Sequence, residues 1–416
     1  MRVLQSILVL LFFFYDSETY SQFGIYVLNE NNDSSGYYRL KNFTETSNHY
    51  FYTGCQYVGN SENTQAGKLL LLDDKMEIQS ESLFGNFNIN NIHIPVILPD
   101  KSIRLYATTM NKGRFNPAII NIDKDFNNVD EKNIVTNQSV YIGDIVIVDE
   151  ENIIVAQAIL DESNTYNITI FQFNTKSNEQ IWSSRLINET NEIPTNIVLM
   201  KDRSIVVLAK RYDHSFSSFS PIIYRLSTVG EKVWTKDMTS SNYGFYNHDI
   251  IHSDNNNLVY TCSYQGRNNE IPRTYILEIN STNGSTILKQ KIDSIKANGI
   301  IQLSNNNYLI YGSLSDEYNN LERSIASYTI INSKLSQVYS YSLLTQNFID
   351  EQMQNRTKNS DLEGSEIFTG VKLQNKDIIM GGYISLPKKE VNNGIEFYNI
   401  ILKTNSEGFL PIKQNN

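Results

Sequence analysis

Residues 196–236 read NIVLMKDRSIVVLAKRYDHSFSSFSPIIYRLSTVGEKVWTK. Two short apolar runs flank a polar turn at residues 201–204, and a variable loop leads to a third apolar run at residues 221–226. A turn at Gly230 then leads to a fourth run that ends at Trp234. Short apolar runs bounded by turn-forming residues are typical of β-strands. The stretch is therefore predicted to form four short strands in up-and-down order.

The same unit recurs along the chain. The first apolar residue of its second strand serves as a marker and falls at Phe51, Ile103, Ile153, Ile205, Leu258, Tyr308 and Ile378. Successive markers are 52, 50, 52, 53, 50 and 70 residues apart. A near-constant period with four strands per unit is typical of propeller blades. We therefore predict an all-β, single-domain, seven-bladed β-propeller over residues 22–416, with four-stranded antiparallel blades at about 37–86, 87–136, 137–188, 189–241, 242–293, 294–343 and 367–416.

Two segments depart from the repeat. Residues 344–366 form an insertion between the sixth and seventh units, and residues 23–28 form an extra apolar run before the first unit. The last unit ends weakly, because Pro411 lies in its fourth strand and lacks an N–H donor. We predict that residues 23–28 join the last blade and latch the ring, since open sheet edges are usually covered. The alternative is a loose N-terminal arm.

The N-terminus has the pattern of a secretory signal peptide. Arg2 is followed by an apolar run at residues 7–15, which is too short to span a bilayer as a helix. Thr19 and Ser21 then lie three residues and one residue before a predicted cleavage point. The pattern predicts a signal peptide at residues 1–21 and a secreted or periplasmic protein without a transmembrane segment. The alternatives are a buried N-terminal strand or an uncleaved anchor.

The formal net charge of −10 argues against nonspecific binding to nucleic acid or to an anionic membrane. The only cysteines, Cys55 and Cys262, each lie four residues after a marker. An exported protein could pair them, but the first and fifth units are not neighbours in a ring of seven. Their second strands should therefore be beyond disulfide reach, and both are predicted to be free, buried thiols.

Trp182 and Trp234 occupy one position of the repeat, 29 residues after their markers, and Ile287 has the same offset. This position falls on the outermost strand, where a large flat side chain can cover the seam to the next blade. We expect core packing to be the role of both tryptophans.

The unit resembles the repeats of exported bacterial propellers of the Bacteroidetes type, which overlap with pyrroloquinoline-quinone-like and delta-60-type repeats. The outer part of the resemblance is carried by STVGEKVWTK (residues 227–236) and NTKSNEQIWSS (residues 174–184). The inner part is carried by QNKDIIMGGYI (residues 374–384) and NNNYLIYGSL (residues 305–314). The resemblance implies the fold and an exported protein, and it implies no particular activity.

The candidate binding residues come from the repeat register. Nine residues before each marker, near the expected start of the innermost strand, stand Ile94, Asp144, Asn196, Asp249, Gly299 and Thr369. Innermost strands line the central channel, so the oxygen-bearing side chains should gather at one mouth of it, with His248 beside Asp249. Such oxygens suit Ca²⁺ or a water cluster. The alternative is polar strand ends bonded to water. The candidates are thus Asp144, Asn196, His248, Asp249 and Thr369.

A second candidate region is the set of long loops between second and third strands, near His214, Tyr318 and Lys388. Such loops often carry binding residues, although ordinary solvated loops look the same. The sequence has no Gly-rich phosphate loop, Ser nucleophile elbow, HExxH motif or paired-Cys metal spacing. No catalytic residue is assigned.

Three functional hypotheses follow. The first is a noncatalytic, monomeric binding or scaffold protein that engages a protein or glycan through its channel-mouth face. The second is a hydrolase or a quinone- or metal-dependent enzyme with its site at that mouth. The third is a purely structural envelope component. A fold of this kind supports many unrelated functions and does not decide between them.

Overall fold

The structure is a computed structural model. It describes residues 24–27, 36–46, 51–59, 67–84, 89–98, 100–111, 114–126, 129–133, 140–177, 179–212, 219–238, 243–266, 273–293, 295–318, 321–342, 364–387 and 395–410. The predicted signal peptide, most of the predicted insertion at 344–366, and the loops at His214 and Lys388 lie outside these residues.

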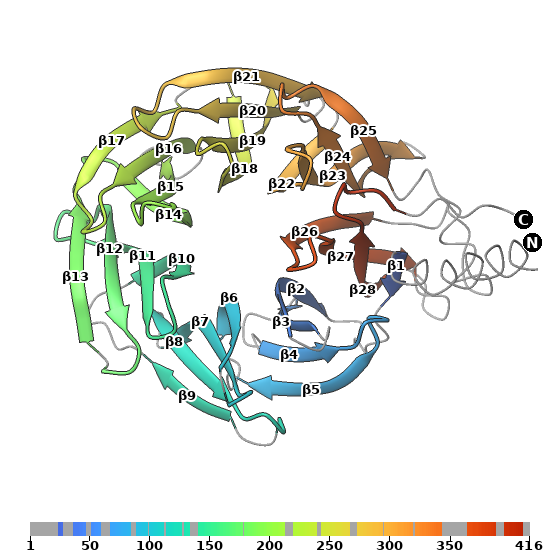
Figure 1. Ribbon diagram of the computed structural model, residues 1–416, viewed down its shortest axis with the longest axis horizontal. Helices are drawn as coiled ribbons and strands as arrows, with labels where there is room; N and C mark the ends of the chain where they lie inside the picture. Colours follow the sequence, from blue (N-terminus) through green and yellow to red (C-terminus); the bar gives the residue numbers. More distant parts are fainter. Residues whose placement is uncertain are drawn as a thin grey trace, which may run out of the picture.

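The described chain forms a seven-bladed β-propeller, as the repeat predicts (Figure 1). Each blade has four antiparallel strands, and successive strands of the sequence run from the channel to the rim. The first and second blades consist of β2 (Gly36–Glu45), β3 (Phe51–Gly59), β4 (Gly67–Leu72) and β5 (Ile78–Phe84), and of β6 (Ile89–Ile97), β7 (Ile103–Asn111), β8 (Arg114–Ile122) and β9 (Val129–Asn133). The third and fourth blades consist of β10 (Val140–Ile147), β11 (Asn152–Leu160), β12 (Tyr166–Asn174) and β13 (Glu179–Leu186), and of β14 (Asn191–Leu199), β15 (Ile205–Tyr212), β16 (Phe219–Leu226) and β17 (Lys232–Asp237). The fifth and sixth blades consist of β18 (Tyr243–His252), β19 (Leu258–Gly266), β20 (Arg273–Ile279) and β21 (Thr286–Asp293), and of β22 (Ile295–Gln302), β23 (Tyr308–Tyr318), β24 (Leu321–Ile331) and β25 (Gln337–Ser342).

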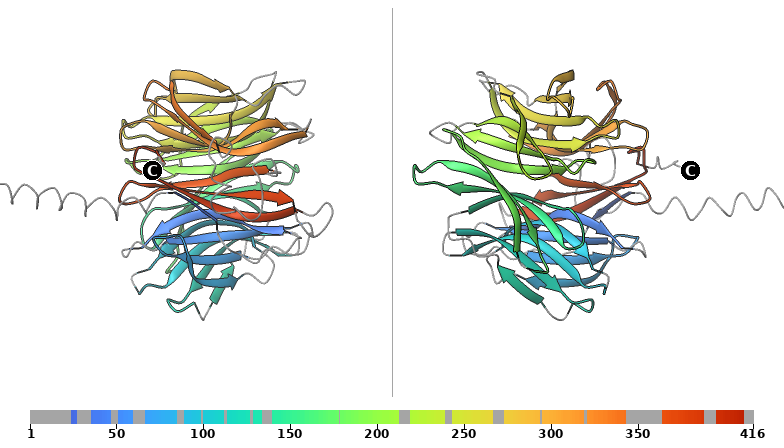
Figure 2. Two further views of the ribbon diagram at one scale, coloured as in Figure 1. Left: turned by 90° about the vertical axis from the view of Figure 1, so that its right-hand side faces the viewer. Right: turned by 60° about the vertical axis from the view of Figure 1, so that its left-hand side comes forward.

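The seventh blade is built from both ends of the described chain. Its inner strands are β26 (Gly364–Lys372), β27 (Ile378–Pro387) and β28 (Ile395–Thr404), and its outermost strand is β1 (Gly24–Val27). Gly24 pairs with Lys403 and Val27 with Ile400, antiparallel. The N-terminal strand therefore latches the ring, as the edge argument predicts (Figures 1 and 2). Residues 405–409 form the turn that precedes the fourth strand in other blades, and β1 occupies the place beside β28 where that strand was expected.

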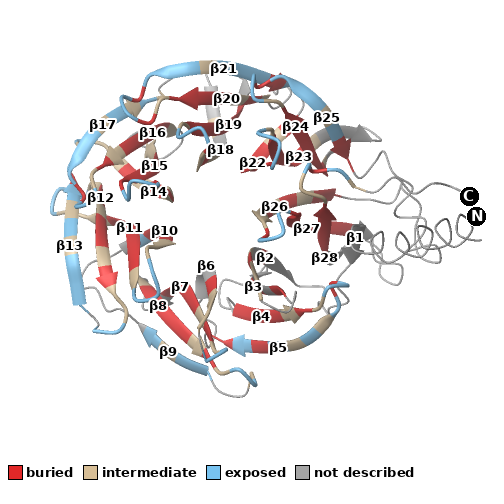
Figure 3. Cartoon of the chain, in the orientation of Figure 1, coloured by how far each residue is buried: buried red, intermediate tan, exposed pale blue. Residues whose placement is uncertain are grey.

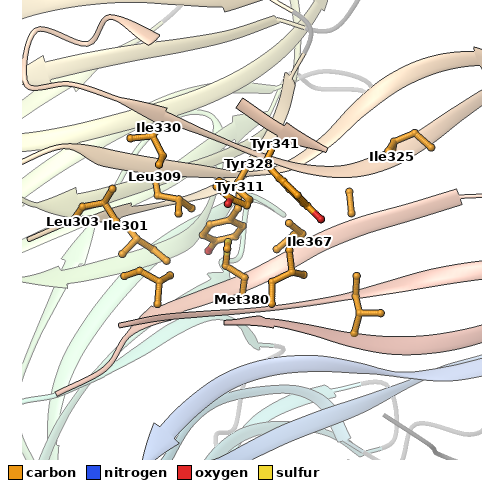
Figure 4. Close-up of a cluster of buried hydrophobic side chains, with 14 of the residues drawn as sticks. Ile301, Leu303, Leu309, Tyr311, Ile325, Tyr328, Ile330, Tyr341, Ile367 and Met380 are labelled. Carbon is orange, nitrogen blue, oxygen red and sulfur yellow. The ribbon is translucent and has the colours of Figure 1, made fainter. Parts of the chain in front are cut away.

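The hydrophobic core is divided among the seams between blades. Seven clusters of buried apolar side chains lie one at each of the seven seams. Figure 4 shows the cluster between the sixth and seventh blades, where Tyr311 and Tyr328 meet Ile367 and Met380. Because the middle strands of a blade are covered on both faces, their sequences are near-continuous apolar runs. The outermost strands face water, as Figure 3 shows.

The turns between first and second strands share one geometry in the second blade and in the fourth to seventh blades. In the fourth blade, the Asp202 carboxylate accepts the N–H of Ser204 (3.0 Å), and Arg203 between them has a φ of 61°. Asn256, Asn306 and Lys376 have positive φ values of 65°, 61° and 74° at the same place in later blades. Polar side chains that bond the backbone two residues on make such turns favourable, which is why Asp and Asn recur there.

The two tryptophans cover seams, as predicted. Gly230, with a φ of 84°, lies so close to Trp182 of the preceding blade that an added Cβ would stand 2.7 Å from its ring. Gly284 lies against Trp234 in the same way, and the Trp234 indole N–H donates to the carbonyl of Ser281 (2.9 Å). The prediction that Ile287 occupies the same position in the fifth blade is wrong.

In the fifth blade, Leu288 occupies the tryptophan position. A bulge between the partners of Glu278 and Ile279 leaves Ile287 unpaired in the strand and 50% exposed. Leu288 instead packs against the next cluster of the core. The offset of 29 residues was misleading because the turn before this strand is one residue longer in the fifth blade than in the fourth.

Cys262 is a free thiol and is buried, as predicted. The side chain of Cys55 lies outside the described set. Among the described residues, no helix is long and apolar enough to cross a membrane.

Candidate functional site

The innermost strands all contain a register shift at the same place. In β14 the shift lies between Pro194 and Asn196, and in β10 it lies between Ile142 and Asp144. β2, β6, β18, β22 and β26 carry corresponding shifts. A β-bulge inserts an unpaired residue and re-aims the side chains beside it. The predicted position nine residues before each marker falls at this bulge, midway along the strand and not near its start.

Two aspartates at the bulge join neighbouring blades. Each accepts the N–H of the next residue in its own strand at 2.8 Å. The second oxygen of Asp144 accepts the N–H of Ile197 in the fourth blade (3.0 Å), and that of Asp249 accepts the N–H of Ile300 in the sixth blade (3.0 Å). A bulge frees N–H groups from the strand ladder, and these carboxylates satisfy them.

Asn196 and His248 continue this line of contacts between the fourth and fifth blades. The Asn196 amide donates to Asp249 (3.0 Å). The Thr195 hydroxyl donates to the Leu208 carbonyl (3.2 Å) and lies 2.7 Å from Nε2 of His248. With the Thr195 proton directed at Leu208, Nε2–H of His248 donates to the hydroxyl oxygen, a contact that both the neutral Nε2–H tautomer and the imidazolium can make.

The structure adds three channel residues that the sequence reasoning missed. Asn42 lies nine residues before the first marker, and the same count would have found it. His93 bonds Thr108 through Nε2 (2.9 Å), and its Nδ1 lies 3.5 Å from Asp144. Asn298 donates to Glu366 and to the carbonyl of Ile367 in the seventh blade, both at 2.7 Å. His93 and Asn298 are bulge residues, one position before the predicted slots.

A cavity of about 740 Å³ occupies the channel beside this ring of bulges. Its wall includes all five candidates, Asp144, Asn196, His248, Asp249 and Thr369, together with Gly370 and Phe368. The cavity reaches the ends of the innermost strands at Leu199 and His252. It therefore extends toward the turns between first and second strands, and away from the end of the channel where the 344–366 insertion enters the seventh blade. Ile94 and Gly299, the other counted positions, add no polar side chain.

The wall of the cavity is electrostatically unusual at Asp249. Burial, together with repulsion from Asp144, raises the pKa of the Asp249 carboxyl to about 7, against the opposing effect of its two backbone N–H bonds. Burial and the nearby Lys210 ammonium hold the pKa of His248 well below its ordinary value. At neutral pH the histidine is therefore uncharged, and Asp249 is near its titration midpoint.

The channel can hold a ligand but offers no preassembled metal cage. Within the described part of the chain, no three His, Cys, Asp or Glu side chains converge in a way that could hold a metal ion. The carboxylates instead bond backbone N–H groups of two blades. The polar ring thus both joins the blades and lines the cavity.

Comparisons with known proteins agree with this architecture. No family model matches the sequence, and no curated protein matches it. Among solved structures, the polysaccharide lyase Uly1 superposes with a TM-score of 0.52 at 9% identity, over 87% of this chain and 89% of that chain. Similarity at this level of identity shows the fold alone.

Two further solved structures illustrate the range of propellers that are similar in shape. Sqt1 from Chaetomium thermophilum has a TM-score of 0.48 at 10% identity, over 90% of this chain and 99% of that chain. The β-propeller domain of the Trilobed protease from Pyrococcus furiosus has a TM-score of 0.43 at 12% identity, over 92% and 99%.

Proposed function

We propose that this protein is a noncatalytic, exported, monomeric binding or scaffold propeller that engages a protein or glycan ligand at the mouth of its channel. The proposal includes the signal peptide at residues 1–21, a secreted or periplasmic location, and a relation to exported bacterial propeller repeats. One observation carries it: the polar residues that face the channel are bonded between blades and form a rigid frame around a cavity. Such a frame can hold a ligand site in a fixed shape, and binding there needs no reactive side chain that moves.

The contacts of Asp144 and Asp249 support this reading. A general acid or a metal ligand needs its carboxylate oxygens directed at the substrate or ion. Here each carboxylate accepts backbone N–H groups from two strands. Asn42, Thr369 and Phe368 also line the cavity wall, where a ligand would contact them.

The test is a binding screen followed by blocking of the cavity. The purified protein is applied to a glycan array and used to capture partners from envelope extract, and a reproducible ligand is expected. Asn42→Arg places a long side chain in the channel and should abolish binding. Val233→Arg is the matched control, because Val233 is 54% exposed on the outermost strand β17, and it should leave binding unchanged. Reproducible silence in both screens, or equal binding by both variants, would count against the proposal.

A second function is favoured by one observation, the pKa of Asp249 near 7 beside Asp144. Two carboxyl groups whose repulsion raises the pKa of one of them resemble the arrangement of a general acid–base pair. The protein would then be a hydrolase or a quinone- or metal-dependent enzyme with its site at the channel. Metal content of the purified protein and the effect of Asp144→Asn on any activity found would test it. No metal and no change in activity would exclude this function.

A further inference from the structure

The wall of the channel cavity is acidic and contains no strong cation. Asp144 and Asp249 line it beside the bulges of β10 and β18. None of the described residues that line the cavity is Lys or Arg. Nδ1 of His93 lies 3.5 Å from Asp144, and within the described chain neither carboxylate forms a salt bridge with Lys or Arg. Carboxylates removed from bulk water are normally paired with a cation, and here a ligand can supply it.

Asp144 keeps acceptor positions for such a cation. A carboxylate has about four lone-pair positions, and the two backbone N–H bonds of Asp144 use two of them. Its side chain is 26% exposed. A metal ion needs more ligands in a fixed geometry, and no three suitable groups of the described chain converge. An ammonium is a compact charge with three rotatable donors, so it fits this arrangement better than a metal ion does.

The wall between the carboxylates and the nearer mouth of the channel is apolar. Val146, Val198 and Ile251 stand two residues after the polar positions of the third, fourth and fifth blades, and all three line the cavity. Residues two apart in a strand lie on the same face. Each apolar side chain therefore follows its polar neighbour toward the turns between first and second strands. A group that enters from that end passes an apolar wall first and reaches the carboxylates after it.

The turns around this mouth are acidic as well. In the second to seventh blades, the described turns between first and second strands carry seven acidic and four basic side chains, a net charge of −3. A surface of this sign speeds the approach of a basic partner and repels an acidic one. The charge of the mouth thus agrees with the charge of the cavity wall.

We propose that this mouth binds a lysine side chain presented by a partner protein. The four-carbon stem lies along Val146, Val198 and Ile251, and the ammonium is bound by Asp144 and Asp249. A lysine has its two parts in this order, a flexible apolar stem and a charge at the tip. An amino sugar carries its ammonium on a ring of hydroxyl groups, which an apolar wall does not match. This inference rests on the proposed function, because it names the ligand of the same channel.

The first test compares three peptides on the wild-type protein by isothermal titration calorimetry. It is done at pH 8, because burial raises the pKa of Asp249 to about 7. The peptides share flanking glycines and carry lysine, acetyl-lysine or norleucine at the centre. The lysine peptide should bind at one site, and the two uncharged peptides should bind at least about tenfold more weakly. Equal binding of all three, or no binding of the lysine peptide, would overturn the proposal.

Substitutions then locate the bound peptide. Asp144→Asn and Asp249→Asn remove a charge from the wall, and each should weaken binding of the lysine peptide by about tenfold or more. Asp130→Asn makes the same charge change at an exposed position of β9 and should leave binding unchanged. Unchanged binding in both channel variants would place the peptide elsewhere and overturn the proposal. Melting temperatures identify a variant that fails to fold, and the comparison of peptides on the wild type does not depend on it.

A partner captured from envelope extract separates this inference from the proposed function. Acetylation of the partner's lysines, which removes their charge, should abolish its capture. Reductive methylation keeps the charge and should leave capture intact. A partner that Asn42→Arg releases but acetylation does not would leave the channel as the binding site and overturn the lysine inference. Binding of a glucosamine oligomer in preference to the lysine peptide would overturn it in the same way.

Discussion

At the scale of single residues, Asp249 shows how a structural contact and a titration are coupled. Its carboxyl joins three blades, through Asn196, its own strand and Ile300. Burial nonetheless favours its protonated form and places its pKa near 7. The same carboxyl in the unfolded chain has a pKa of about 3.9. Folded protein therefore binds a proton between these pH values that unfolded protein does not.

This difference sets the sign of a pH effect on stability. The contribution of Asp249 to the free energy of unfolding is fully present below about pH 4 and is lost as the pH rises through about 7. Over this range the free energy of unfolding falls by at most about 1.4 kcal/mol per pH unit. We expect the free energy of unfolding to fall between pH 5 and pH 8. In Asp249→Asn this component of the slope should vanish. Urea denaturation of both proteins at the two pH values measures it, and parallel curves would contradict it.

Glu192 is a buried carboxylate held by one cation and two neutral donors. Its carboxylate is fully buried and accepts from Arg211 Nε (2.9 Å), Asn188 Nδ2 (2.7 Å) and the Tyr224 hydroxyl (2.5 Å). Removal of one partner from a buried ion pair leaves an uncompensated charge.

Arg211→Met is therefore expected to cost about 3–5 kcal/mol of stability. The control is Lys176→Met, which breaks the exposed pair between Lys176 and Glu151 (2.9 Å) and should cost under about 1 kcal/mol. Chemical denaturation of both variants gives the comparison. Equal losses would mean that the burial of Glu192 is not maintained in solution.

At the scale of elements, the indole ring of Trp182 packs on the turn at Gly230 and holds the outer strand of the third blade to the fourth blade. Gly230 combines a positive φ with contact against Trp182. Gly230→Ala is therefore expected to lose about 1–3 kcal/mol, from strain in the left-handed region and from overpacking. Gly364→Ala is the control, because its nearest side-chain neighbour would be at an ordinary 3.4 Å. Thermal unfolding of the two variants checks the difference.

The elements also show what the sequence can and cannot predict. Strand order, blade number and the latch follow from local patterns and from edge chemistry. The slots Asp144, Asn196 and Asp249 follow from the repeat register. The bulges do not, because a bulge is a relation between two paired strands and leaves no mark in either alone. For this reason the slots were placed near strand starts. Ile287 was taken for the tryptophan position because the turn before it is one residue longer than in the fourth blade.

The surroundings of single residues are harder to predict for the same reason. Lys210 lies in an apolar strand and looks like any solvated lysine in the sequence. Its setting is made by Phe219 in its own blade and by His248 in the next, which only the packing of blades brings together. His93 and Asn298 stand one position before the counted slots, and only the bulge turns them toward the channel wall.

At the scale of the whole molecule, closure of the ring rests on β1. The seventh blade would otherwise expose β28 as an open edge, since the segment after β28 turns at Gly408 and Leu410 packs against the sixth–seventh cluster. Four residues of β1 pair with β28. A backbone hydrogen bond contributes about 0.5–1.5 kcal/mol net, so a latch with about one such bond per paired residue should contribute about 2–6 kcal/mol.

A chain that begins at residue 29 should therefore unfold at lower urea concentration than one that begins at residue 22. It should also self-associate, because an uncovered edge strand pairs with other chains. Urea titration measures the first effect, and light scattering after size exclusion measures the second. Addition of a synthetic peptide with the sequence of residues 22–29 should reverse both effects in the shorter chain. Identical midpoints for the two chains would mean that the seam between the seventh and first blades holds the ring closed without the latch, through the cluster of Phe43, Phe51 and Ile401.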